Sequence, residues 1–93
     1  MQAELILDDR YPQGDHAFVA IRVLRVPQQV PGSAHDLKYS LAYVVNGVCV
    51  LRFDNEAGKG DHFHRGKLET KYRFTSLEKL LTDFWVAVDD WRE

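Results

Sequence analysis

The feature that most constrains this chain is an Asn-Gly step between two apolar runs. Residues 38–54 read KYSLAYVV-NG-VCVLRFD, with Asn46 and Gly47 at the centre. Both central positions of a type I′ turn need a positive φ, which asparagine and glycine tolerate better than other residues. The step therefore predicts an antiparallel β-hairpin with a two-residue turn.

The turn also predicts which face of the hairpin is buried. A two-residue turn opposes Val45 to Val48, and continued pairing opposes Tyr43 to Val50. The other face is the more apolar, so we expect it to be the core face, with Val44, Cys49, Ala42, Leu51, Ser40 and Phe53. The first face would then carry Tyr39, Tyr43, Arg22 and Arg52 away from the core, where aromatic and arginine side chains can stack on single-stranded RNA.

The remaining elements follow from periodicity. Alternation predicts strands at residues 3–8, 16–26 and 69–74, and turn-forming residues predict loops at 9–15, 27–37 and 55–66. A capping-box pattern at residues 75–78 precedes apolar residues at helical spacing, which predicts a helix over about 76–91. The fold class expected is α+β, an antiparallel sheet of four or five strands with a C-terminal helix packed on one face.

Composition sets the protein class. The 93 residues are 45% hydrophobic with a formal net charge of −2, which fits a single folded domain over residues 1–93 and excludes a disordered chain. No apolar run approaches the ~20 residues of a membrane span, so we expect no membrane association. Cys49 is the single cysteine, which excludes a disulfide framework and favours a cytoplasmic location.

Residues 54–65, DNEAGKGDHFHR, concentrate the reactive groups of the chain. His62 and His64 are two residues apart, so in an extended segment they point to the same side, about 7 Å apart. Such a pair can bracket a phosphodiester, one imidazole acting as base and the other as acid. Asp54 or Asp61 could orient an imidazole.

Groups for holding the phosphate lie close by. Lys59 stands between Gly58 and Gly60, where the backbone can approach a phosphate, and Arg65 could hold developing negative charge. No metal or other cofactor is needed when the nucleophile is an RNA 2′-hydroxyl. The same residues leave two alternatives open: a metal site formed by the two histidines with Asp61 or Asp54, and a solvated loop without chemistry.

His35 lies in the loop predicted at residues 27–37. It follows Pro31-Gly32-Ser33 and could approach the end of the hairpin.

The pattern Y-x-L-A-Y-V-V-x-G-V-C-V-L-R-[FY]-D-N-E-x-G-K-G-D-H-x-H, followed by F-T-S-[LV]-E-x-L-L-x-D-F, resembles the TumE-like toxins of bacterial type II toxin–antitoxin modules. The resemblance covers residues 17 to 85. It implies a growth-inhibiting toxin encoded beside an antitoxin. The family commonly has arginine between the two histidines, where this chain has Phe63, so phosphate binding here would depend on Arg65 or Lys59.

Together these observations predict the toxin of a toxin–antitoxin module that acts as a metal-independent ribonuclease. The alternative is a non-enzymatic module that inhibits growth by occupying a protein target. The partner expected is the co-encoded antitoxin, with RNA or a second copy of this chain as further candidates for the mixed sheet face.

Overall fold

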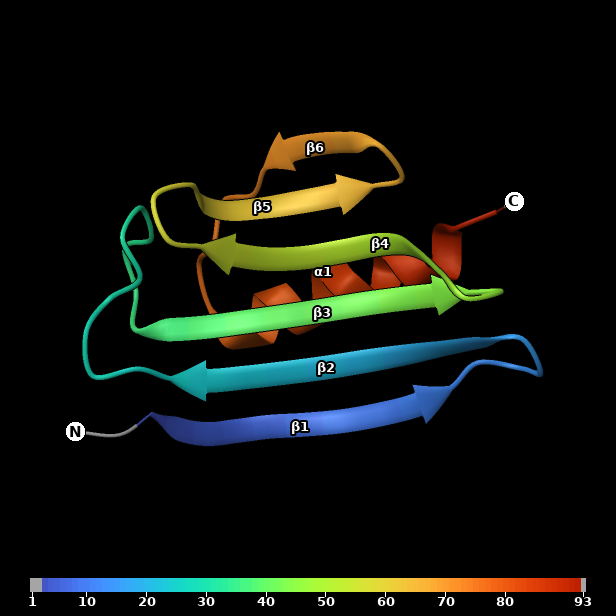
Figure 1. Ribbon diagram of the computed structural model, residues 1–93, viewed down its shortest axis with the longest axis horizontal. Coiled ribbons are helices and arrows are strands. Elements are labelled where there is room, and N and C mark those ends of the chain that lie inside the picture. The colour runs from blue at the N-terminus through green and yellow to red at the C-terminus, as the bar shows by residue number, and fades with distance from the viewer. Residues whose placement is uncertain (1–2, 93) are drawn as a thin grey trace.

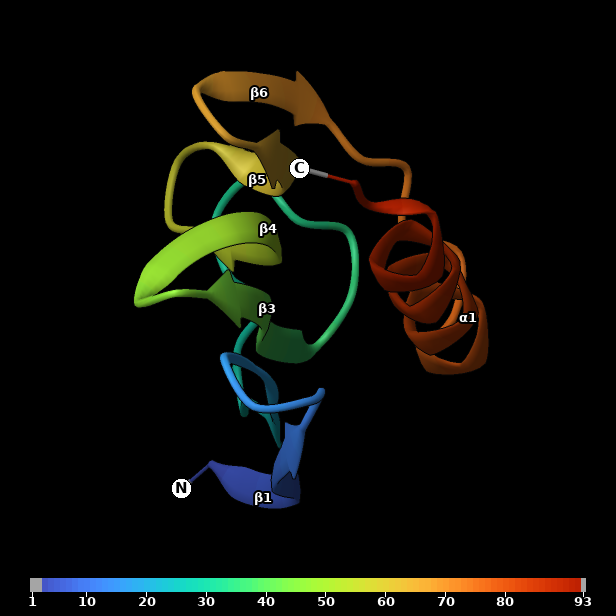
Figure 2. The ribbon, with the colours of Figure 1, turned by 90° about the vertical axis from the view of Figure 1, so that its right-hand side faces the viewer.

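In the computed structural model, which describes residues 3–92, the chain forms one antiparallel sheet and one helix (Figure 1). The six strands lie in the sheet in chain order: β1 (Glu4–Pro12), β2 (Ala17–Arg25), β3 (Leu37–Val45), β4 (Val48–Glu56), β5 (Gly60–Arg65) and β6 (Leu68–Lys71). The helix α1 (Leu77–Asp90) packs along one face of the sheet (Figure 2). We call that side the inner face and the opposite side the outer face.

The α+β class and the C-terminal helix are confirmed, whereas the expected four or five strands are in fact six. The predicted loop at 55–66 is confined to the turns at 57–59 and 66, and residues 60–65 form β5 instead. Gly58 and Gly60 adopt φ values of 85° and 77° and make a tight turn that lets β5 pair with β4. The predicted loop at 9–15 is wrong in its first half. Strand β1 continues to Pro12, which is tolerated because β1 is an edge strand.

The Asn46-Gly47 hairpin is confirmed, but its predicted register holds only next to the turn. Asn46 and Gly47 have φ values of 51° and 78°, and Val45 opposes Val48 as expected. Beyond the pair Val44–Cys49 the register shifts, so that Tyr43 opposes Leu51 rather than Val50. The extra residue is a β-bulge, and one extra residue moves the rest of a strand to the other face.

The bulge reverses the predicted faces of β3. Tyr39 and Leu41 point into the core and are 3% and 0% exposed, whereas Cys49 is exposed. Tyr39 and Tyr43 therefore do not lie on the outer face with Arg52, and Ala42, Val44 and Ser40 are not core residues. Leu51 and Phe53 are buried as predicted, because the bulge brings them to the same side as Leu41.

Helix α1 covers the inner face through the apolar side chains that its sequence spacing predicts. Leu80, Phe84 and Val88 are buried, and the Phe84 ring meets Phe53 edge-on with 6.1 Å between centroids. Ser76 rather than Thr75 is the N-cap, and its side chain accepts a hydrogen bond from the Lys79 backbone N–H. Within residues 3–92 no helix has the length and apolar character needed to cross a bilayer.

Strand β6 ends at Lys71, before the predicted end at residue 74, because Tyr72 turns toward the core. Its ring meets Phe53 edge-on and its hydroxyl donates to Asp83 of α1 at 2.6 Å. Burial, followed by the Asp83 carboxylate, raises the pKa of Tyr72. The pKa of Asp83 is lowered, because hydrogen bonds from Lys79 and Tyr72 outweigh the opposing effect of burial. This contact attaches the helix to the end of the sheet.

Because of the bulge, Leu51 and Cys49 lie in different environments, and substitutions at the two positions should differ in their effect on stability. Leu51→Ala removes a side chain that is 1% exposed, and we expect it to lower the free energy of unfolding by about 2–4 kcal/mol. Cys49→Ala changes an exposed residue two positions earlier, and we expect a change within about 0.5 kcal/mol. Urea unfolding of both variants measures the difference. Equal losses would show that the register shift is absent.

Candidate functional site

A network of hydrogen bonds attaches the loop after β2 to the inner face of β4. The Asn55 side chain, in a residue that is 2% exposed, accepts from the Tyr39 backbone N–H at 2.9 Å and donates to the Leu37 carbonyl at 2.7 Å. It also donates to the Ser33 hydroxyl at 3.2 Å. Asn55 therefore provides hydrogen-bond partners for backbone groups that would otherwise be buried without them. This role stabilises the fold and is not a role in chemistry.

Asp61, on β5 opposite Asn55, is the second centre of this network. Its carboxylate accepts hydrogen bonds from Ser33, from the Tyr39 hydroxyl at 2.9 Å and from His35 Nε2 at 2.7 Å. The Asp61 side chain is only 7% exposed. Burial and then the Asp61 carboxylate raise the pKa of the Tyr39 phenol, so Tyr39 stays a neutral donor. Tyr39, predicted to bind substrate on an open face, instead lies in the core.

His35 approaches the end of the hairpin as its position in the loop predicts, and both of its ring nitrogens are used. The Leu37 backbone N–H donates to Nδ1 at 3.2 Å, which places the ring proton on Nε2, where it meets Asp61. The Phe74 ring stacks on His35 with 3.8 Å between centroids. An imidazole held in this way orients the loop and has no free nitrogen for proton transfer.

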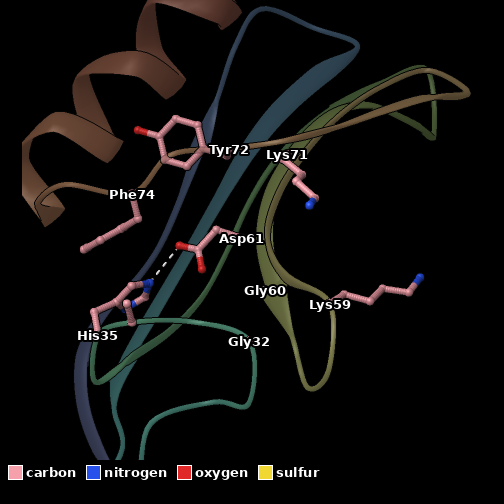
Figure 3. Close-up of a pocket in the computed structure, with 9 residues that line it drawn as sticks. Gly32, His35, Lys59, Gly60, Asp61, Lys71, Tyr72 and Phe74 are labelled. Atoms are coloured by element: carbon pink, nitrogen blue, oxygen red, sulfur yellow. Dashed lines mark hydrogen bonds and ion pairs between the residues drawn. The ribbon is translucent and has the colours of Figure 1, made fainter.

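Two glycines allow the loop and the β4–β5 turn to touch. A Cβ on Gly60 would lie 2.6 Å from the Gly32 carbonyl oxygen, and the Gly58 N–H donates to the Pro31 carbonyl at 2.7 Å. Beside this contact a pocket of about 270 Å³ opens between the loop, the start of β5 and the segment after β6 (Figure 3). Asp61 and His35 form its inner wall, and the Lys59 side chain extends away from them.

His62 and His64 project from the other side of β5, onto the outer face. Phe63 between them stacks on Phe53 in the core with 4.4 Å between ring centroids, and side chains alternate along a strand, so both histidines face outward. Their rings are 6.4 Å apart, close to the spacing expected for an extended segment. The side chains are 12% and 23% exposed, so both are accessible but largely held in place.

Each histidine uses one ring nitrogen to fix its orientation. His62 Nδ1 donates to the Gly60 carbonyl at 3.1 Å, and His64 Nε2 donates to Asp54 Oδ1 at 3.2 Å. The other nitrogens, His62 Nε2 and His64 Nδ1, make no hydrogen bond within the described residues and lie 3.6 Å and 3.9 Å from the Glu69 carboxylate. A neutral imidazole in either arrangement keeps one nitrogen able to accept a proton.

Two basic residues stand opposite the histidines on neighbouring strands. The Arg52 Cα pairs with that of His64, and the Lys71 Cα with that of His62. Arg52 Nε lies 3.3 Å from Asp54 Oδ2, although it has no hydrogen-bond partner within residues 3–92. Arg52 was expected to bind substrate from the sequence. Lys71 was not, because only the sheet brings it beside His62.

The other predicted site residues do not join the histidine pair. Lys59 lies in the β4–β5 turn, 3.8 Å from Glu56, and Arg65 has the strand parity of Asp61, on the side of the sheet opposite His64. Asp61 faces inward, so a metal set of His62, His64 and Asp61 is excluded by geometry. Across residues 3–92 no three His, Cys, Asp or Glu side chains are grouped as metal ligands.

The comparisons with known proteins decide the family. The family model described as "Toxin TumE" matches residues 2–92. This chain belongs to the TumE toxin family. Among curated proteins and among solved structures nothing matches.

Membership confirms the resemblance, and the structure divides the motif that carried it between the two faces of the sheet. Asn55, Gly58, Gly60 and Asp61 join the loop to the hairpin on the inner face. Asp54, His62 and His64 form the outer group. The sequence signal that separates them is the alternation of side chains along a strand, which puts Asp61 on the side opposite His62 and His64 once β5 is a strand.

The close approach of Gly60 to Gly32 leads to a matched test of the inner group. Gly60→Ala and Gly66→Ala both place a side chain at positive φ, 77° and 58°, which costs about 1 kcal/mol. Only the Cβ at residue 60 meets backbone, whereas the Cβ at residue 66 has open space. We expect Gly60→Ala to lower the melting temperature several degrees further than Gly66→Ala. Similar melting temperatures would show that the loop does not contact the turn.

Proposed function

We propose that this toxin is a metal-independent endoribonuclease whose catalytic residues are His62 and His64. The observation that carries the proposal is the outer-face pair itself: two imidazoles 6.4 Å apart, each fixed through one nitrogen, with Arg52 and Lys71 on the flanking strands. Two groups that can exchange roles as proton donor and acceptor near neutral pH are what cleavage of RNA by its own 2′-hydroxyl requires.

The reaction needs no external nucleophile. One imidazole removes the 2′-hydroxyl proton, and the 2′-oxygen attacks the adjacent phosphorus to form a 2′,3′-cyclic phosphate. The bond from phosphorus to the 5′-oxygen breaks, and the second imidazole, protonated, gives its proton to that oxygen. His62 Nε2 and His64 Nδ1 are the nitrogens available for these transfers, since the opposite nitrogens hold Gly60 and Asp54.

The surrounding charges fit this chemistry. Arg52 and Lys71 can hold the nonbridging phosphate oxygens, whose negative charge grows as the 2′-oxygen attacks. Asp54 is a positioning residue, because its carboxylate fixes the His64 ring from the side away from the substrate and pairs with Arg52. Lys71 takes the place that Lys59 and Arg65 were expected to have.

The toxin is proposed to work in the bacterial cytoplasm as part of a type II module, bound by a co-encoded antitoxin. Family membership supports this partner. The surface also supports it. On the β2–β3 half of the outer face the side chains of Phe18, Ala20, Ala42 and Val44 are half-buried. The Arg10 guanidinium lies 3.8 Å from the centre of the Phe18 ring, and the helix α1 packs on the opposite face. A partly apolar sheet face of this kind is typical of a protein interface.

The catalytic proposal is tested by RNA cleavage with purified protein. We expect His62→Ala and His64→Ala each to lower the rate by roughly 10²–10⁴, the usual size of a general acid–base contribution. The dependence of the rate on pH should be bell-shaped, because one imidazole has to accept a proton and the other has to donate one. The charged groups facing the pair are Arg52, Asp54, Glu69 and Lys71. Lys71→Ala should slow cleavage more than Lys67→Ala.

The controls separate chemistry from folding and from metal binding. His16→Ala changes an exposed histidine before β2 and should keep the wild-type rate, and every variant must keep the wild-type melting temperature. EDTA should leave the rate unchanged. Loss of RNA cleavage in EDTA, restored by one divalent ion, would favour a metal mechanism. Full toxicity of the variant that lacks both histidines would favour the non-enzymatic module.

The partner is tested by sedimentation of the 10.8 kDa chain alone and with the product of the adjacent gene. At about 50 µM, where even a weak interface of standard size should form, we expect a heavier complex with that product. Ala42→Lys on the outer face should weaken it, whereas Val86→Lys on the exposed side of α1 should not. A monomer under both conditions contradicts the partner, and self-association alone indicates a homodimer instead.

A further inference from the structure

The Glu69 side chain lies between the two histidine rings, although the pairing of β6 with β5 does not require a carboxylate there. It is on the four-residue edge strand β6, with its Cα opposite that of His64. One carboxylate oxygen is 3.6 Å from His62 Nε2 and the other is 3.9 Å from His64 Nδ1. A single carboxylate therefore spans the pair, with one oxygen toward each ring.

The nitrogens that Glu69 faces are the two that make no hydrogen bond elsewhere in the described part of the chain, residues 3–92. His62 Nδ1 is bound to the Gly60 carbonyl and His64 Nε2 to Asp54, so the remaining nitrogens both point toward the same anion. Two fixed imidazoles converge on one oxyanion, and Lys71 stands opposite His62 on β6, so the group can form a site for a ligand with two negative oxygens. A carboxylate and a phosphodiester share that chemistry.

Glu69 is held only loosely in this site. Both distances exceed a hydrogen bond, and the Glu69 side chain is 40% exposed, compared with 12% for His62. All four residues of β6 are exposed, and the strand pairs on one side only. The carboxylate can therefore leave by side-chain rotation without disturbing the core.

We propose that His62 Nε2, His64 Nδ1 and Lys71 form an oxyanion site for the phosphate of the substrate, and that Glu69 occupies this site in the free toxin. Glu69 is then an internal competitor: it lowers affinity for phosphate and must move before RNA is cleaved. The identity of the ligand rests on the proposed ribonuclease function, but the oxyanion site can be tested without RNA.

The direct test is a titration with inorganic phosphate at about pH 5.5, where phosphate carries one negative charge, as a phosphodiester does. The imidazole NMR signals of His62 and His64 report binding. We expect Glu69→Gln to bind phosphate roughly 3–10-fold more tightly than wild type, because a like charge leaves the site. Glu78→Gln, on α1 across the sheet, is the matched control and should bind as wild type does.

RNA kinetics give a second reading that separates competition from other roles. A competitor that leaves before reaction affects binding alone, so Glu69→Gln should lower KM by a similar factor with kcat unchanged. A fall in kcat would show that Glu69 takes part in the reaction and would overturn the proposal, and so would phosphate affinity equal to wild type. The melting temperature of the variant should stay within a degree or two of wild type, since Glu69 is exposed.

The two proposals can fail independently. Tighter phosphate binding by Glu69→Gln without any RNA cleavage would keep the oxyanion site and remove the ribonuclease. Cleavage that depends on His62 and His64 but does not respond to Glu69→Gln would keep the ribonuclease and remove the competitor.

Discussion

The inward anchoring of Asp61 is the interaction on which the outer site depends. Its carboxylate accepts hydrogen bonds from Ser33, His35 and Tyr39, and each of these comes from the loop after β2 or from β3. Side chains alternate along a strand, so fixing Asp61 on the inner face fixes His62 on the outer face, and the Phe63–Phe53 stack then sets His64. A group that touches no substrate therefore decides where the two imidazoles point.

This arrangement changes how mutations in the motif should be read. A variant at Asn55 removes the partner of buried backbone groups, and a variant at Asp61 removes the acceptor of three side-chain hydrogen bonds. A side chain at residue 60 closes the space between loop and turn, so the first effect of all three is on stability. Variants at His62, His64 or Lys71 change half-buried or exposed groups at the surface. Loss of toxicity in the first group would follow from lower stability, whereas in the second group it would follow from a changed surface. The two kinds of residue are nevertheless neighbours in the sequence.

The electrostatics of the outer site is balanced rather than basic. Arg52 and Lys71 stand against Asp54 and Glu69, so the site is not a strong attractor for polyanions when Glu69 is in place. Moving one exposed carboxylate changes that balance by a full charge close to both imidazoles. In the oxyanion site proposed above, a ligand that draws Glu69 away would increase the affinity of that site for phosphate.

Sequence alone determined the local elements of this protein, because their causes are local. Asn46-Gly47 made the hairpin, the apolar spacing after Ser76 made the helix, and the His-x-His spacing set two imidazoles on one side of an extended segment. Tertiary structure decided which face each residue occupies. One extra residue in β4 reversed the predicted faces of β3, and two glycines turned most of an expected loop into a strand. Lys71 and Glu69 joined the histidines only through pairing of β6 with β5, since cross-strand neighbours are set by register and not by distance along the chain.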